Sequence, residues 1–175
     1  MHIIFAIIVL ILSLISSSFT TDYRANDAES YQTAMGGFVS ECSNRMPRIE
    51  ELGEYKSIFV SKQKPIFDLW LSYRAIAVIV EYDEAGLQQQ LAKISEGYDF
   101  IEEEIPGDVS DLDASVNGFQ FAIVEDPDDL YLRWYVMIIG VNQHENKVAY
   151  LLYAYDGIDG IDDLDKFITT YFILE

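Results

Sequence analysis

The amino-acid sequence predicts an α+β fold, with helices packed on one mixed, mostly antiparallel sheet. The apolar, largely β-branched run at residues 75–80 (AIAVIV) is typical of a central strand covered on both faces. Further strand-like segments follow at 119–124, 134–141 and 148–155, and an amphipathic helical pattern covers 161–172. Because strands and helices occur along one chain of ordinary domain length, we expect helices layered on a sheet around one core.

Residues 1–21 are predicted to direct the chain to a membrane. An apolar stretch at 3–15 (IIFAIIVLILSLI) is followed by small polar residues, as in a secretory signal peptide. The segment before it contains no Lys or Arg, and the apolar run extends to Phe19, so an uncleaved membrane anchor is the alternative. Either interpretation leaves residues 22–175 as one acidic domain outside the cytoplasm, secreted or anchored by its N-terminus.

The first half of this domain is expected to begin with a helix capped by Asn26 or Asp27. The helix has an apolar stripe with helical spacing, made of Tyr31, Met35, Phe38 and Cys42. Strands are predicted at 56–61 and 66–71.

Residues 75–101 are expected to form a β-α-β unit. Asp83 caps its helix, Gly97 ends it as a C′ glycine, and 98–101 returns as a strand parallel to 75–80. A polar loop is predicted at 107–117. Farther along the chain, 142–147 reads as a hairpin turn, and the N-terminal helix, the crossover helix and the C-terminal helix 161–172 are all expected to pack on the sheet.

The charge pattern excludes one class of partner. The formal net charge is −19, and residues 81–175 carry twenty-two acidic against four basic side chains. Such a surface repels phosphate backbones, so we expect no nucleic-acid partner and contact with a membrane only through the N-terminal segment. Cations, basic proteins or simple solubility remain as reasons for the acidity.

Residues for catalysis are few. His144 is the only histidine after the leader and lies in the predicted hairpin turn, and Cys42 is the only cysteine. Nucleophile–histidine arrangements and zinc sites are therefore disfavoured, and no catalytic residue is assigned. A hydrolase with paired carboxylates is a third reading, of low specificity in so acidic a chain.

Calcium is the one cofactor that the sequence suggests. The segment 156–165 fails the EF-hand pattern because Ile158 and Gly160 occupy ligand positions. If the last three strands form a meander, however, two acidic connections leave the sheet at the same end. The candidate ligands are Asp126, Asp128, Asp129, Asp156 and Asp159, with helix capping and solvation as the alternative.

Aromatic residues supply the other candidate site. Tyr131, Trp134, Tyr153 and Tyr155 lie on or beside the final hairpin, where an exposed row would suit a peptide or glycan. Packing beneath a helix is the simpler alternative. Alternation along the strand places Tyr150 on the opposite face from Tyr153 and Tyr155.

Four stretches carry a resemblance to a known group: MPRIEELGEY, AVIVEYDEAGLQQQLAKI, NGFQFAIVED and VMIIGVNQHENKVAYLLYAYDGIDGIDDL, together covering roughly residues 46–165. They resemble small predicted exported proteins of unknown function from clostridia-like Gram-positive bacteria. The resemblance implies export and a single domain, with no assigned activity. The sequence thus favours an extracytoplasmic, non-enzymatic binding or interaction domain, with a protein, peptide or glycan as ligand. A calcium-stabilised structural module is the alternative.

Overall fold

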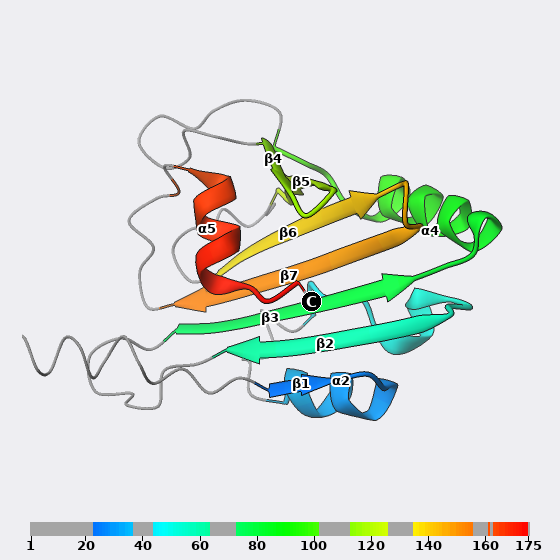
Figure 1. Cartoon of the computed structure of the whole chain (residues 1–175), viewed down its shortest axis with the longest axis horizontal. Helices are drawn as coiled ribbons and strands as arrows, with labels where there is room; N and C mark the ends of the chain where they lie inside the picture. Colours follow the sequence, from blue (N-terminus) through cyan, green and yellow to red (C-terminus); the bar gives the residue numbers. More distant parts are fainter. Residues whose placement is uncertain are drawn as a thin grey trace, which may run out of the picture.

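The computed structural model describes residues 23–36, 44–63, 73–101, 113–125, 135–155, 161 and 163–174. These residues form one antiparallel sheet of seven strands in the order β1-β2-β3-β7-β6-β5-β4, with helices on both faces (Figure 1). The α+β class is therefore confirmed. The strands are β1 (Tyr23–Ala25), β2 (Ser57–Gln63), β3 (Tyr73–Glu81), β4 (Asp113–Val116), β5 (Phe119–Ile123), β6 (Tyr135–Asn142) and β7 (Lys147–Tyr155).

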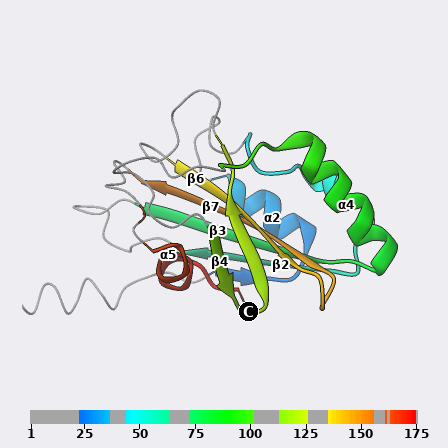
Figure 2. The same cartoon turned by 90° about the horizontal axis from the view of Figure 1, so that it is seen from above.

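Each α-helix among the described residues begins after an aspartate whose side chain accepts a hydrogen bond from a backbone N–H of the first turn. Asp27 caps α2 (Ala28–Met35), Asp83 caps α4 (Glu84–Gly97) and Asp163 caps α5 (Leu164–Tyr171). A 3-10 helix, η1, spans Ile49–Leu52. Figure 2 shows α5 on one face of the sheet, with α2 and α4 on the other.

Two apolar cores result because the sheet is covered on both faces. Along β3, Ala75, Ala77 and Ile79 face one core while the intervening residues face the other. The α5-side core also contains Leu164 and Ile168 of α5. The α4-side core collects residues of α2, η1 and α4, including Tyr31, Leu52, Leu87 and Ile94. Strand β3 is thus a central strand buried on both faces, as the sequence predicts.

The predicted parallel β-α-β unit is wrong. Strand β3 pairs antiparallel with β2 and β7, and every strand pair among the described residues is antiparallel. After α4 the chain makes only an isolated antiparallel bridge, between Phe100 and Val124 at the end of β5. Helix α4 therefore leads the chain from β3 to the other half of the sheet, beside the end of β5.

Smaller differences concern the ends of elements. Gly97 belongs to α4, and the cap residue is Tyr98 in extended conformation, so no C′ glycine terminates this helix. Part of the predicted polar loop is strand β4, which joins β5 through Asn117 and Gly118. The expected strand 66–71 and the leader 1–21 lie outside the described residues, as do Phe38 and Cys42 of the apolar stripe.

The two flanks of the sheet are tied to the C-terminal part of the chain. The backbone N–H of Ser115, on edge strand β4, donates to Oδ1 of Asp165 on α5 at 2.9 Å. On the other side, the hydroxyl of Ser61 on β2 donates to the carbonyl of Ile173 at 2.8 Å. The segment after α5 therefore crosses the sheet toward β2, and Phe172 and Leu174 are buried in the α5-side core.

Candidate functional site

Of the four aromatic residues predicted to form a binding surface, Tyr153 is the one whose side chain the structure describes. It is 5% exposed and belongs to the α5-side core. Its ring centroid lies 5.0 Å from that of Phe167 and 4.7 Å from that of Tyr171, both on α5. Tyr153 is therefore a packing residue beneath a helix. Tyr131, Trp134 and the side chain of Tyr155 lie outside the described part of the chain.

The five candidate calcium ligands, Asp126, Asp128, Asp129, Asp156 and Asp159, also lie outside it. The strands that flank them are described. Strands β5, β6 and β7 form an antiparallel meander in which Ile123 pairs with Ile138, and Tyr135 pairs with Ala154. The end of β5, the start of β6 and the end of β7 therefore lie at the same end of the sheet. Within the residues that the structure describes, no group of three or more potential metal-binding side chains occurs.

The opposite core leads to a different surface, on the side of α2 and α4. Residues 46–51, which we call the ridge, run between these helices with Met46 and Pro47 buried. A hollow of about 290 Å³ lies between the ridge and α2. Its lining combines apolar side chains with charged ones and consists of Tyr31, Gln32, Met35, Met46, Pro47, Arg48, Ile49 and Glu50.

A second hollow, of about 270 Å³, lies on the other side of the ridge, against α4. Its lining is Pro47, Glu51, Gln90, Lys93, Ile94, Gly97 and Tyr98. Pro47 borders both hollows, so one short segment of chain separates them. Each hollow is just below the size usual for small-molecule sites.

Side-chain hydrogen bonds to backbone carbonyls hold the ridge in place. The hydroxyl of Tyr31 on α2 donates to the carbonyl of Pro47, and Nζ of Lys93 on α4 donates to the carbonyl of Glu51 at 3.1 Å. The hydroxyl of Tyr98 donates to the carbonyl of Arg45 at 3.3 Å. The ridge is thus fixed from both helices, which leaves its outward side chains preorganised for contact.

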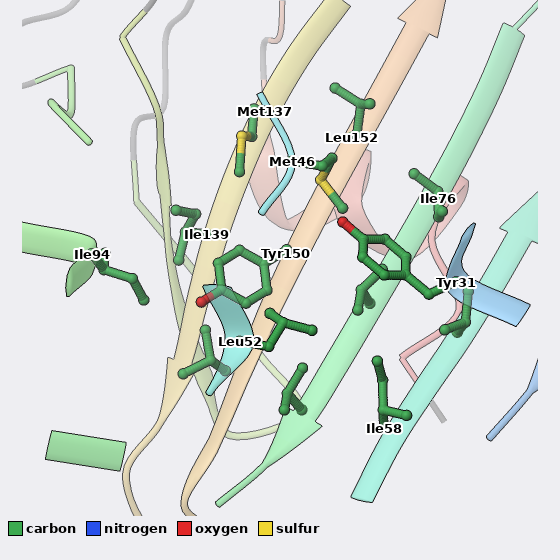
Figure 3. Close-up of a cluster of buried hydrophobic side chains, with 14 of the residues drawn as sticks. Tyr31, Met46, Leu52, Ile58, Ile76, Ile94, Met137, Ile139, Tyr150 and Leu152 are labelled. Atoms are coloured by element: carbon green, nitrogen blue, oxygen red, sulfur yellow. The ribbon is translucent and has the colours of Figure 1, made fainter. Parts of the chain in front are cut away.

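Beneath the ridge, the hydroxyl of Tyr150 lies among apolar side chains of the α4-side core (Figure 3). It accepts a hydrogen bond from Nε2 of Gln90 at 2.7 Å, and both residues are buried. The hydroxyl of Tyr82 is buried nearby and has no hydrogen-bond partner among the described residues. Burial raises the pKa of Tyr82, and the nearby hydroxyl of Tyr150 offsets part of this rise. The two hydroxyls nevertheless do not meet hydrogen-bond geometry.

These tyrosines stay protonated at neutral pH. Burial, with a smaller effect of nearby Glu51, raises the pKa of Tyr98 to about 12. Burial also raises the pKa of Tyr31, Tyr82 and Tyr150. A neutral phenol donates hydrogen bonds and packs against apolar groups, and this is the chemistry that Tyr31 and Tyr98 offer where they line the hollows.

Sequence reasoning did not identify this surface. The stretch containing Pro47 is interpreted from the sequence as the end of the first helix or the start of a short turn. The two hollows depend on α2 and α4, which are separated in the chain by the whole of β2 and β3. One signal in the sequence could have pointed to this surface, namely the tyrosines that occupy apolar positions of the pattern. Buried tyrosine hydroxyls require polar partners, so such residues indicate hydrogen bonds to neighbouring segments.

The chain matches no known protein family model, no curated protein and no solved structure. In the part of the chain that the structure describes, no helix is long and apolar enough to span a membrane.

Proposed function

We propose that this protein is an extracytoplasmic, non-enzymatic binding domain that holds a peptide segment of its partner across the ridge. The observation that carries the proposal is the pair of hollows on either side of residues 46–51. A peptide that lies over the ridge can place one side chain in each hollow, with Pro47 between them.

The composition of the surface supports a peptide ligand. Met35 and Ile49 are half-buried and provide apolar contact beside the first hollow, while Arg48 and Glu50 are exposed at its rim. Interfaces commonly combine an apolar centre with a polar rim, and Met and Arg are enriched in them. Because the ridge is already fixed by hydrogen bonds, binding requires little ordering of this surface.

The test is selection from a random peptide display library against the folded protein, followed by calorimetric titration of the enriched peptides. Ile49→Ser should weaken their binding by at least about tenfold, the factor that corresponds to about 1.4 kcal/mol. Val141→Ser is the matched control, because Val141 is also half-buried but lies on β6 and lines neither hollow. Absence of enriched peptides, or equal affinity for the Ile49→Ser protein, contradicts the proposal. If the protein instead binds glycans on an array, its ligand is a glycan and the peptide proposal is wrong.

Placement outside the cytoplasm rests on the apolar leader at residues 1–21. Expression of the full chain with a C-terminal reporter that is active only after export tests it. Deletion of residues 3–15 should abolish reporter activity, and unchanged activity of the deletion variant contradicts export through this segment.

A calcium-stabilised module is the second candidate, supported by the shared sheet end of β5, β6 and β7. A specific cation bound by the native state raises the melting temperature beyond what matched ionic strength achieves. The combined Asp128→Asn and Asp156→Asn variant should lose this extra increment. Glu84→Gln is the control, because Glu84 begins α4 after β3 has reached the opposite end of the sheet. Equal shifts with calcium and sodium in the original protein contradict the candidate.

A further inference from the structure

The turn between β4 and β5 consists of Asn117 and Gly118, both exposed. Their φ angles are +51° and +79°, so both residues are in the left-handed region, the pattern of a type I′ hairpin turn. Glycine adopts this conformation without steric cost, and asparagine tolerates it better than most residues.

The fold requires glycine at the second of these positions for two independent reasons. Its φ disfavours any other residue, and a Cβ atom there would lie 2.9 Å from Nδ2 of Asn142. Asn142 is itself fixed, because it is buried and its Oδ1 accepts a hydrogen bond from the backbone N–H of Glu145 at 3.0 Å. The fold therefore requires glycine after Asn117, and because glycine has no side chain, its backbone nitrogen is not shielded.

This arrangement has a chemical consequence for the exposed amide of Asn117. We propose that Asn117 is a site of spontaneous deamidation in the folded protein. The backbone nitrogen of Gly118, losing its proton to solvent, attacks Cγ of Asn117 and forms a C–N bond. The bond from Cγ to Nδ2 breaks, and the departing nitrogen takes up a proton and leaves as ammonia. Water then hydrolyses the cyclic imide at either carbonyl, which yields aspartate or isoaspartate.

The two products affect the hairpin differently. Aspartate keeps the backbone and adds one negative charge to the edge of the sheet. Isoaspartate routes the main chain through the side-chain carbon and so lengthens a turn that joins directly paired Val116 and Phe119. Because both flanking residues are buried in the α5-side core, the longer turn disturbs packing as well as pairing.

The chain contains an internal control for this chemistry. Asn146, in the turn before β7, also has a positive φ, +55°, but is followed by Lys147, whose side chain hinders attack by its backbone nitrogen. The two asparagines therefore have a similar φ, while the residue that follows differs and Asn146 is half-buried where Asn117 is exposed.

The experiment is incubation of the folded full chain at weakly alkaline pH and physiological temperature, followed by proteolysis and peptide mass spectrometry. The peptide that carries Asn117 should gain about 1 Da, the difference between an amide and an acid. Conversion at Asn117 should exceed that at Asn146 at least tenfold (an order-of-magnitude expectation), because glycine lacks a shielding side chain. Incubation at weakly acidic pH should slow the reaction, since the attacking nitrogen must lose its proton.

Asn117→Gly is the matched variant, because it keeps a residue that accepts positive φ and removes the amide. Its turn peptide should show no mass gain, and an isoaspartate-specific methyltransferase should label the aged original protein more than the aged variant. Equal conversion at Asn117 and Asn146, while circular dichroism shows a folded protein, overturns the proposal.

Discussion

Substitution of Gly140 by alanine should destabilise the fold by overpacking. Gly140 lies on β6 opposite Phe121 of β5. A Cβ atom built on Gly140 lies 2.2, 2.4 and 2.9 Å from three carbons of the Phe121 ring, all well inside van der Waals contact. The ring cannot swing away freely, because it stacks on Phe119 with centroids 5.5 Å apart.

The magnitude follows from this geometry. Extra atoms forced into a packed core cost about 1–3 kcal/mol. At about 2–4 °C per kcal/mol for a chain of this size, the melting temperature should fall by about 2–12 °C. Three simultaneous close contacts favour the upper part of that range. The assay is thermal unfolding followed by circular dichroism, with chemical denaturation to obtain the free energy of unfolding.

Two further variants separate the clash from general effects of replacing glycine. Gly97→Ala changes the last residue of α4, where a Cβ atom has no neighbour within 4 Å, and should stabilise the protein by about 0.4–1 kcal/mol. Phe121→Leu combined with Gly140→Ala should cost less than the sum of the two single changes, because the smaller side chain leaves room. A Gly140→Ala protein as stable as the original, or strictly additive effects in the pair, would refute the reasoning.

Three other predictions concern hydrogen bonds and ionisation. Tyr82→Phe removes a buried hydroxyl without a described partner and should leave the free energy of unfolding unchanged or raised. Tyr150→Phe removes the acceptor of the buried Gln90 amide and should lower the free energy of unfolding by about 1–3 kcal/mol. Denaturant titration measures both. Asp165→Ala removes the acceptor of an edge-strand N–H and should lower stability by about 0.5–1.5 kcal/mol and speed amide hydrogen exchange in β4; unchanged exchange contradicts that role. Burial raises the pKa of these tyrosines, to about 12 for Tyr98, so the unfolded chain loses its phenolic protons at lower pH than the folded protein does. The free energy of unfolding should therefore fall as pH rises from about 10 toward 12, and tyrosinate absorbance should appear together with loss of the fold. Gradual ionisation of a protein that stays folded contradicts this.

Local pattern predicted the long, buried elements and the β6–β7 hairpin well, and the partners of β3 poorly. The run AIAVIV identifies β3 because a strand buried on both faces has no polar alternation, and the segments around 142–147 identify the β6–β7 hairpin. Edge strands β1 and β4 are short and partly exposed, so no apolar run marks them. The strand–helix–strand order around α4 suggested a parallel crossover, but β3 pairs with β2 before it and with β7 far along the chain, both antiparallel.

The candidate site shows the same limit. Capping residues mark α2 and α4 in the sequence, yet the hollows exist only where these helices meet the ridge. The hydrogen bond from Tyr31 to Pro47 and the one from Gln90 to Tyr150 join residues with no periodic relation. Alternation did place Tyr150 and Tyr153 on opposite faces of β7, as found in the two cores.

The position of β7 between β3 and β6, with the tail after α5 fastened to β2, also sets when the molecule can fold. The central ladder between β3 and β7 joins segments that are synthesised far apart, so closing the long loop between them must precede the contacts of that ladder. Strands β1 to β3 emerge from the ribosome long before β7, the neighbour of β3, exists. The α5-side core is incomplete until Leu174 has been made, and apolar strands that are exposed in that interval favour association with other chains.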